Sequence, residues 1–159
     1  MLVRPIEYGS ADYQAAKELR RRFLREPLGL ELTDADTAGE DHQHHYGLFA
    51  AGDPPAPDGW LLGAAIGMPD ALDPATVRIR QVVVHSDWRS RGAGRQLMAE
   101  AERALAALGF QRCVLYAREN AQSFYERCGY RATGAAKELI GLPHLEFQKR
   151  LTESATNRL

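Results

Sequence analysis

The chain has 159 residues, of which 45% are hydrophobic and 26% are charged, and its formal net charge is −1 at pH 7. This length and composition are typical of one globular domain and exclude a collagen, a coiled coil or a chain disordered throughout. The balanced charge gives no reason to expect bulk binding of nucleic acid, and no apolar run approaches the ~20 residues of a membrane span. With no apolar signal core and only two cysteines, Cys113 and Cys128, we expect a cytoplasmic protein without a disulfide scaffold.

The first third of the chain predicts one strand followed by one helix. Weak alternation over residues 2–8 indicates the strand, and Ser10 can cap a helix that runs to about Leu24. A Pro-Leu-Gly sequence at residues 27–29 ends that helix. The polar, acidic stretch at residues 33–43 then predicts a loop or a short irregular helix.

Three strands are expected next. Residues 45–50 and 60–66 are apolar, and the Pro- and Gly-rich turn at residues 52–59 predicts that they pair as a hairpin. A loop at residues 70–74 leads to a third strand at residues 77–84. Strict alternation predicts that one face of this strand carries Val77, Ile79, Gln81 and Val83.

The C-terminal half alternates helices with strands. A long helix is expected at residues 92–108, with an apolar stripe that ends at Leu108 and a stop at Gly109. A buried strand at 113–117 and a helix from Asn120 to Gly129 follow, and the last strands are expected at 130–133 and 144–151. This order predicts an α/β layered domain with a mixed sheet over residues 1–151 and a polar tail at 152–159.

An apolar strand enters a glycine- and arginine-rich turn at residues 85–94, and the turn runs into the long helix. The first N–H groups of a helix have no internal partner and lie at the positive end of its dipole. Gly92 and Gly94 leave room for a phosphate near this backbone, while Arg91 and Arg95 add positive charge. Neither a P-loop nor a dinucleotide-binding pattern is present, so the alternative is a tight turn that binds nothing.

Two segments, in this order, resemble the GNAT (Gcn5-related) N-acetyltransferase family. The spacing Arg-x-x-Gly-x-Gly at residues 89–94, after a valine-rich strand, resembles the coenzyme A pyrophosphate loop of that family. One helix and one strand later, residues 117–130 are similar to the family's A-x-x-x-Y-x-x-x-G-[F/Y] helix. The resemblance covers residues 2–151, and the flanks at residues 19–29 and 141–144 look like the ElaA/YjcF-like branch.

The resemblance implies a single-domain, three-layer α/β fold in which a mixed, mostly antiparallel sheet is flanked by helices. It also implies acetyl-CoA as co-substrate, with the pantetheine arm lined by Val82, Val83 and Val84. The pyrophosphate would be held by the turn residues Arg89, Arg91, Gly92, Ala93, Gly94 and Arg95. Asn120 is a further candidate for coenzyme binding, although many family members place an asparagine where this sequence has Arg118. A helix N-cap is the alternative role for Asn120.

Acyl transfer from a thioester to an amine needs a neutral amine, a donor for the oxyanion and a proton for the departing thiolate. By the resemblance, Tyr125 is the general acid, because the family's tyrosine at this position often has that role. A phenol, with a pKa of about 10, is nearly matched to a thiol, with a pKa of about 8.5. The alternative is a core tyrosine, since Ala121, Phe124 and Tyr125 also suit the buried face of a helix.

The general base is left unassigned. Residues 40–45 contain two carboxylates and three histidines, which indicate either an amine-binding rim or, as the preferred interpretation, a solvated loop. Arg25, His45 and His144 are the candidates for contact with the acceptor, and a structural role is the alternative for His144. The basic run at residues 17–26 is interpreted as a solvated helix face, and no metal site is expected because no ligand spacing extends beyond one His-x-His pair.

The sequence therefore predicts an acetyl-CoA-dependent N-acyltransferase that moves an acetyl group to a primary amine by direct attack, with Tyr125 as general acid. One alternative is transfer of another acyl group such as succinyl, and another is a non-catalytic module that binds acyl-CoA. The acceptor would be a small-molecule or protein amine. Neither nucleic acid nor membrane is an expected partner, and a homodimer is common among such domains.

Overall fold

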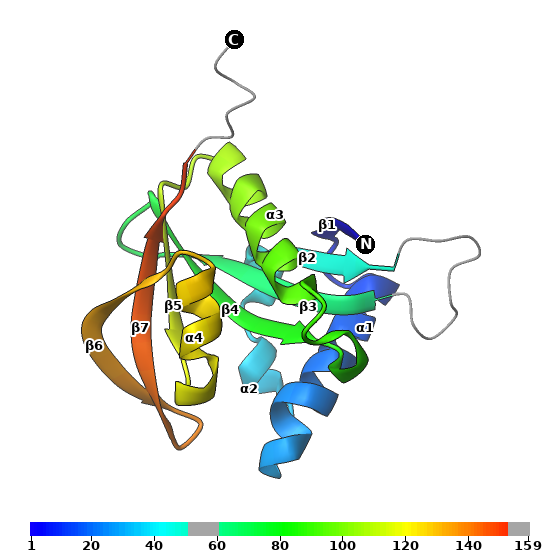
Figure 1. Ribbon diagram of the computed structural model, residues 1–159. Coiled ribbons are helices and arrows are strands. Elements are labelled where there is room, and N and C mark those ends of the chain that lie inside the picture. The colour runs from blue at the N-terminus through cyan, green and yellow to red at the C-terminus, as the bar shows by residue number, and fades with distance from the viewer. Residues whose placement is uncertain (51–60, 153–159) are drawn as a thin grey trace. The chain divides into compact units, whose positions relative to one another are not determined.

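The computed structural model describes residues 1–50 and 61–152 (Figure 1). Its strands are β1 (Leu2–Ile6), β2 (His44–Phe49), β3 (Leu61–Pro69), β4 (Thr76–Val84), β5 (Arg112–Ala117), β6 (Arg131–Leu139) and β7 (Leu142–Arg150). Its α-helices are α1 (Ala11–Arg20), α2 (Asp34–Thr37), α3 (Ala93–Ala107) and α4 (Gln122–Arg127). No helix within these described ranges has the length and apolarity that a membrane crossing requires. The predicted turn at 52–59 and the tail from residue 153 lie outside the described residues.

The strands are hydrogen-bonded in the order β1-β2-β3-β4-β5-β7-β6. β1 pairs with β2, β2 with β3, and β7 with both β5 and β6, all antiparallel, whereas β4 and β5 run parallel. A parallel pair needs a crossover connection, and α3 supplies it here. The predicted α/β fold, with a mixed and mostly antiparallel sheet flanked by helices, is confirmed, and so is the hairpin of β2 and β3.

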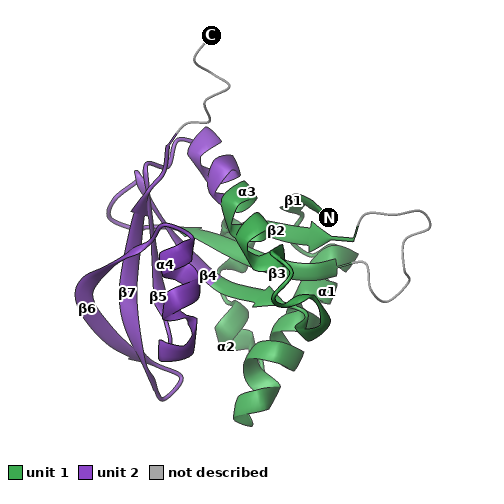
Figure 2. Cartoon of the chain, in the orientation of Figure 1, with its two compact units in different colours: residues 1–68, 81–101 green, residues 69–80, 102–159 purple. Residues whose placement is uncertain are grey.

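The chain forms two compact units, which Figure 2 shows in different colours. Unit 1 contains residues 1–68 and 81–101, and unit 2 contains residues 69–80 and 102–159. The boundary falls inside β4 and inside α3, so each unit holds part of both elements.

The start of unit 1 follows the predicted order of strand, capped helix and turn. The Ser10 hydroxyl accepts a hydrogen bond from the Tyr13 N–H at 3.2 Å, which caps α1 as predicted. α1 continues into a π-helical turn, η1 (Arg21–Arg25), and a 3-10 turn, η2 (Glu26–Leu28), and Gly29 ends the run with φ 69°. The unit 1 core combines this helix with residues of four strands: Ile6, Tyr13, Ala16, Leu19, Phe49, Leu61, Ala64 and Val83.

Glu40 is the centre of a buried polar cluster in unit 1. Its carboxylate accepts two hydrogen bonds from the Arg20 guanidinium, at 2.8 and 2.9 Å, and one from the Tyr13 hydroxyl at 2.8 Å. The Arg20 and Glu40 side chains are only 2% and 0% exposed. The Glu40 carbonyl also accepts a hydrogen bond from His45 Nε2 at 2.7 Å. The cluster therefore joins α1 to the segment before β2.

The interpretation of residues 17–26 and 40–45 as solvated is wrong for three charged residues, because Arg20, Arg25 and Glu40 are all buried. A charge is buried at tolerable cost only when it is paired and hydrogen-bonded. Arg20 has its partner in Glu40, and Arg25 Nη2 lies 3.9 Å from Asp36 Oδ1. The partners lie on distant segments, so local sequence periodicity could not reveal them.

Unit 2 buries a thiol, a phenol and a carboxylate together. The Tyr130 hydroxyl donates to Glu102 at 2.8 Å and lies 3.2 Å from the sulfur of Cys113. Lys149 Nζ donates to Glu102 at 2.6 Å and to the Cys128 carbonyl at 2.7 Å. Burial raises the pKa of the Cys113 thiol to about 12, which agrees with the prediction of an inert thiol. No disulfide joins the two cysteines, both of which are described.

The end of α3 follows the predicted stop signal. Gly109 has φ 102°, and its N–H and that of Phe110 make the paired backbone hydrogen bonds of a Schellman motif at 3.0 and 3.3 Å. The predicted apolar stripe is buried as far as Leu105. It is wrong at Leu108, which is 59% exposed because the helix already ends at Ala107.

We expect Glu40→Gln to destabilise the protein by about 3–5 kcal/mol, because the change leaves the buried Arg20 guanidinium without its countercharge. Urea unfolding should show the loss as a lower midpoint. The matched control is Glu18→Gln, which breaks an exposed pair with Arg21 whose side chains are 60% and 47% exposed. That change should cost no more than about 0.5 kcal/mol. Equal midpoints for the two variants would contradict the structural role of Glu40.

The buried Cys113 thiol should make the stability of the protein fall with pH. Its folded pKa of about 12 lies above that of an unfolded thiol, so the folded state keeps a proton that the unfolded state loses. The stabilisation is therefore complete below pH ~8.5 and declines as pH rises toward 12, by about 1.4 kcal/mol per pH unit. Urea unfolding between pH 8 and 11 should show a steeper decline for wild type than for Cys113→Ala. Parallel curves for the two proteins would exclude this linkage.

Candidate functional site

β4 carries a break in its backbone at Gln81. This residue has φ 55°, in the left-handed region that residues other than glycine rarely adopt. The predicted alternation holds from Val77 to Arg80, with Val77 and Ile79 buried, but the prediction of an uninterrupted strand is wrong at Gln81. Gln81 Oε1 is buried and has no hydrogen-bond partner among the described residues. Strained backbone and orphaned buried polar atoms in native proteins often mark functional sites.

The three valines that follow the break lie in unit 1. Val83 is buried in the core, whereas Val82 and Val84 are half-buried. Gly63 on β3 allows a close approach, because a Cβ at this position would lie 2.8 Å from the Val83 carbonyl oxygen. The backbone of this part of β4 is therefore held in place by a contact that only glycine permits.

The turn after β4 is held by its own hydrogen bonds and contains a 3-10 turn, η4 (Ser86–Trp88). The His85 N–H donates to the Leu62 carbonyl at 2.8 Å, and His85 Nδ1 accepts from the Asp87 N–H at 3.1 Å. Arg89 Nε donates to the Val84 carbonyl at 3.3 Å. These bonds fix the path of the chain between β4 and α3.

Phe23 from η1 packs against the same turn. Its ring centroid lies 4.8 Å from that of His85, and the Arg89 guanidinium lies 5.6 Å from the Phe23 ring. Phe23 therefore supports the turn from the helical run that follows α1. π-helical turns are uncommon and are often found at functional sites.

Two left-handed residues, Ser90 with φ 62° and Gly92 with φ 77°, direct the chain into α3. The Gln96 N–H donates to the Gly92 carbonyl at 3.0 Å and makes the first backbone bond of the helix. The amides of residues 93–95 precede it, so they have no acceptor inside the helix. They stand at the positive end of a helix of 15 residues, where an anion is stabilised.

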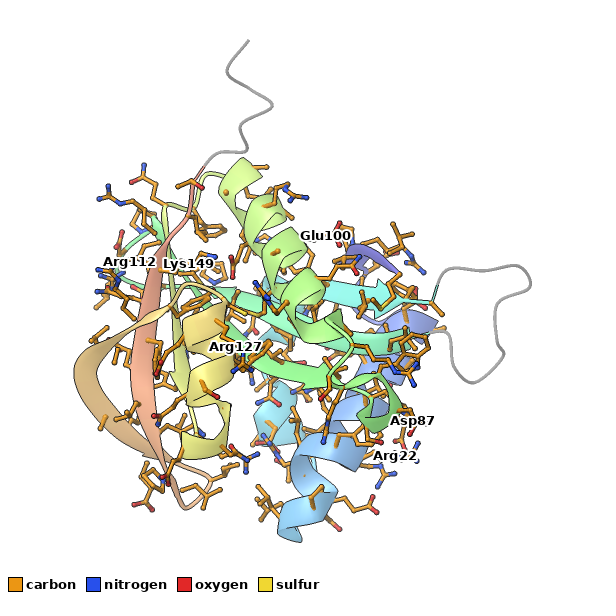
Figure 3. All side chains as sticks on the ribbon, in the orientation of Figure 1. Arg22, Asp87, Glu100, Arg112, Arg127 and Lys149 are labelled. Atoms are coloured by element: carbon orange, nitrogen blue, oxygen red, sulfur yellow. The ribbon has the colours of Figure 1, made fainter. Side chains whose placement is uncertain are left out.

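Cationic side chains surround these amides. Arg89, Arg91 and Arg95 are all exposed, and the Arg91 guanidinium lies 5.2 Å from the ring of Trp88. Asp87, labelled in Figure 3, is the single carboxylate between residues 85 and 95, and its side chain is 81% exposed. The turn thus combines unpaired amides with a local excess of positive charge, which is the chemistry of a phosphate-binding site.

Tyr125 lies on α4 in unit 2. Its ring is half-buried, 5.0 Å from that of Phe124 and 6.0 Å from that of Tyr130 between centroids. Burial raises the pKa of Tyr125 above its ordinary value, so the phenol stays protonated at neutral pH. Its hydroxyl makes no hydrogen bond with any described residue. The ring therefore packs as the core interpretation predicts, while its O–H remains available as a donor.

The predicted N-cap role of Asn120 is wrong. The residue lies inside a 3-10 turn, η5 (Glu119–Ala121), in which the Ala121 N–H donates to the Arg118 carbonyl at 2.9 Å. α4 starts two residues later at Gln122, and no side chain caps it. The local 3-10 turn displaces the helix start. The Asn120 side chain is exposed, and its contact with the coenzyme stays a prediction.

The three acceptor-side candidates are buried and have structural partners. Arg25 lies near Asp36, and His45 donates to the Glu40 carbonyl. His144 is 8% exposed, and its Nδ1 donates to the Leu142 carbonyl at 2.9 Å. These contacts favour the structural alternative for His144, and the solvated-loop interpretation is wrong for His45, which is 7% exposed. Within residues 1–50 and 61–152, no group of three or more His, Cys, Asp and Glu side chains is arranged to hold a metal ion.

Sequence reasoning missed two residues of the site. Gln81 was assigned to a regular strand, although a lone amide among valine and isoleucine positions was a signal that this face was not plain core. Trp88 was passed over because an aromatic residue in a turn has no periodicity to interpret. Its ring packs against Arg91, so its contribution became visible only in the structure.

Comparisons with known proteins agree with this geometry. The sequence pattern described as "Acetyltransferase (GNAT) domain" matches residues 58–151, more than half of the chain. A curated relative, the uncharacterized N-acetyltransferase YitI of Bacillus subtilis (strain 168), is 24% identical over 94% of this chain and 99% of its own length.

Solved structures share the fold at low sequence identity. Escherichia coli ElaA has a TM-score of 0.72 and 20% identity, covering 94% of this chain and 99% of its own. An aminoglycoside 6'-N-acetyltransferase, solved in complex with coenzyme A, has a TM-score of 0.72 and 15% identity, covering 97% and 99%. The domain match over more than half of the chain places it in the GNAT acetyltransferase family of acyl-CoA-dependent N-acyltransferases.

Proposed function

We propose that this protein transfers an acetyl group from acetyl-CoA to a primary amine by direct attack. The observation that carries the proposal is the start of α3, where the amides of residues 93–95 have no acceptor in the helix and exposed arginines lie close by. The match to an acetyltransferase domain favours acetyl as the transferred group. The coenzyme A complex of the aminoglycoside enzyme with the same fold supports coenzyme A as the carrier.

In this proposal the turn holds the pyrophosphate of the donor. The left-handed Gly92 and the amides of Ala93, Gly94 and Arg95 supply backbone donors, and Arg89 and Arg91 supply charge. A helix N-terminus favours a phosphate because its dipole and its unpaired N–H groups act together. Asn120 is assigned the weaker role of a contact to another part of the coenzyme.

The backbone of Val82, Val83 and Val84 is assigned to the pantetheine arm and to the thioester carbonyl. The left-handed Gln81 supports this assignment, since a break of this kind disrupts the regular hydrogen bonding of a strand and leaves backbone groups for a ligand. A backbone N–H donated to the carbonyl would stabilise the oxyanion that forms when the amine attacks.

Tyr125 is assigned the proton transfer to the leaving thiolate. The amine nitrogen bonds to the thioester carbon, the C–S bond then breaks, and the amine's surplus proton leaves to water. The Tyr125 hydroxyl gives its proton to sulfur and is protonated again from solvent. Burial raises the pKa of Tyr125. The same surroundings would also raise the pKa of the departing thiol, so the two pKa values would remain similar. Among the described residues the hydroxyl has no hydrogen-bond partner, as expected of a donor that awaits a ligand.

The acceptor is assigned only as a class. Polyamines, aminoglycosides, amino acids and protein amines all present a primary amine, and no charge pattern on this chain selects among them. The absence of a disulfide between Cys113 and Cys128 is consistent with a reducing compartment, and we place the reaction in the cytoplasm. The likeness to ElaA likewise supports the ElaA/YjcF-like branch.

Acetyl-CoA and free CoA should raise the unfolding temperature of the protein, whereas ATP should not. A ligand at 100 times its dissociation constant adds about 2.7 kcal/mol, which corresponds to several degrees for a domain of this size. The double variant Arg91→Gln, Arg95→Gln should bind CoA about tenfold more weakly or worse, because charge-assisted contacts are lost. Arg103→Gln is the matched control, an exposed arginine further along the same helix.

Three results would change the assignment of the donor. A larger rise in unfolding temperature with succinyl-CoA than with acetyl-CoA would indicate that succinyl is the transferred group. Equal loss of CoA affinity in Arg103→Gln would remove the turn as the pyrophosphate site. No shift with any acyl-CoA would mean that the turn after β4 binds no coenzyme.

Tyr125→Phe should lower kcat by about 10²–10⁴-fold and leave the CoA dissociation constant unchanged, because only the donated proton is removed. Stopped assays of free CoA release against a panel of primary amines measure the first quantity, and calorimetry measures the second. Because the pKa of Tyr125 is raised, kcat of wild type should show no decline between pH 7 and 9.5 that depends on this residue.

The control for this substitution is Tyr8→Phe, which removes the hydroxyl of a tyrosine that is 49% exposed and should change neither quantity. A Tyr125→Phe variant with full kcat would exclude the general-acid role. A wild-type protein that binds acetyl-CoA yet acetylates none of the amines would favour a binding module over an enzyme for the amines tested.

A further inference from the structure

Unit 2 contains a cavity of about 850 Å³ that the acyl-transfer proposal does not use. The residues that line it lie at the start of β5, at the end of β7 and at the start of β6. From β4 it takes Thr76, the first residue of that strand. The proposed pyrophosphate turn, by contrast, follows Val84, the last residue of β4. The cavity is thus a separate feature of the fold, and its volume is in the range of about 300–1,000 Å³ of ligand pockets.

Cationic side chains dominate the lining of this cavity. Arg112, Arg131 and Arg150 line it and are exposed, and none of the three makes a hydrogen bond or an ion pair with a described residue. Figure 3 labels Arg112 and Lys149, another lining residue, at the same end of unit 2. Three guanidinium groups therefore gather at one cavity, with no hydrogen-bonded carboxylate among the described residues.

The strand register places these charges where they repel one another. Arg112 on β5 lies directly opposite Arg150 on β7, and Arg131 on β6 lies opposite Gln148 on β7. Residues 148 and 150 share a face of β7, since side chains alternate along a strand, so the three arginines lie on one face of the sheet. Like charges directly opposite each other destabilise a strand pair. A bound anion between them would turn this repulsion into attraction.

Among the described residues, Asp73 is the only carboxylate that lines the cavity, and its own turn already engages it. Asp73 accepts from the Thr76 hydroxyl at 2.6 Å and from the Ala75 N–H at 3.0 Å. The Thr76 hydrogen bond, the Ala75 hydrogen bond and the nearby Arg112 hold the pKa of Asp73 below its ordinary value. Its oxygens are used, so one carboxylate leaves most of the arginine charge uncompensated.

The remaining wall of the cavity is rigidly built. Lys149 is held by Glu102 at 2.6 Å and by the Cys128 carbonyl at 2.7 Å. Gly129 makes room for its stem, because a Cβ there would lie 3.3 Å from Lys149 Cε. The glycine also has φ 96°, which disfavours any other residue. The part of the lining formed by Gly129 and Lys149 is therefore fixed by these contacts.

We propose that this cavity binds a small polyanion, a phosphorylated or polycarboxylate molecule, through Arg112, Arg150 and Arg131. A guanidinium presents two parallel N–H donors that match a phosphate or a carboxylate, and two opposed guanidiniums can hold one anion between them. The proposal does not rest on acyl transfer, since none of these residues belongs to the turn or to α4. The anion would act as an effector bound apart from the donor.

The test is a calorimetric titration of the full chain with pyrophosphate and, separately, with citrate at fixed ionic strength. We expect saturable binding of at least one, and the double variant Arg112→Gln, Arg150→Gln should weaken it about tenfold or more. The matched control is Arg127→Gln, an exposed arginine of unit 2 that does not line the cavity and should leave the affinity unchanged. Preference between the two anions distinguishes a phosphate from a carboxylate ligand.

Pyrophosphate could also bind the turn before α3, so the variant Arg91→Gln, Arg95→Gln is titrated alongside. Binding that survives in this variant and is lost in the Arg112 and Arg150 variant supports the cavity, whether or not CoA binds the turn. Binding lost only in the turn variant overturns the proposal and leaves the donor site intact. Failure of both anions to bind wild type at millimolar concentration also overturns it.

Thermal unfolding supplies a second readout that does not need a known ligand. Without added anion, Arg112→Gln should unfold at a higher temperature than wild type, because it removes the repulsion across β5 and β7. In the Arg91→Gln, Arg95→Gln background, where binding at the turn is weakened, pyrophosphate or citrate should raise the midpoint, and adding Arg112→Gln to that background should remove the rise. A lower midpoint for the variant without anion would contradict the argument from strand register.

Discussion

Unit 1 is organised around the carboxylate of Glu40. Its oxygens hold Arg20 and Tyr13, and its carbonyl holds the ring of His45, so one residue joins α1, the segment before β2, and β2 itself. Arg20 is the last residue of α1, and η1 begins directly after it. The ion pair therefore anchors the chain directly before η1, and Phe23 of η1 packs against the turn after β4.

The turn itself depends on backbone geometry more than on side chains. Gly63 allows β3 to approach the Val83 carbonyl, His85 is anchored to Leu62, and Gly92 directs the chain into α3. The amides that follow are positioned by the helix and need no particular side chain to point at an anion. A site of this kind tolerates wide sequence change, which fits a shared fold at 20% identity with ElaA.

Local signals were sufficient to predict the elements of the fold. The Ser10 cap, the stop at Gly109 and the periodicity of α3 each depend on a few neighbouring residues, and the structure confirms them. The burial of Arg20 by Glu40 was not predictable, because the two residues are 20 positions apart and both look like surface charges.

The break at Gln81 was equally hidden, since no residue type there demands a left-handed backbone. At the candidate site, the turn was found by its resemblance to a family, whereas the cap assigned to Asn120 failed because a short 3-10 turn competes with the helix start.

The two proposed anion sites differ in which groups would hold a ligand. At the turn before α3, the helix fixes the position of the backbone N–H donors, which therefore does not depend on the pairing of any side chain. At the unit 2 cavity, Arg112 and Arg150 are exposed guanidiniums whose attraction is screened within about 8 Å at physiological ionic strength. Binding at the cavity should therefore respond more strongly to salt and to the concentration of competing anions than binding at the turn. That difference suits a tightly held co-substrate at the turn and a responsive effector at the cavity.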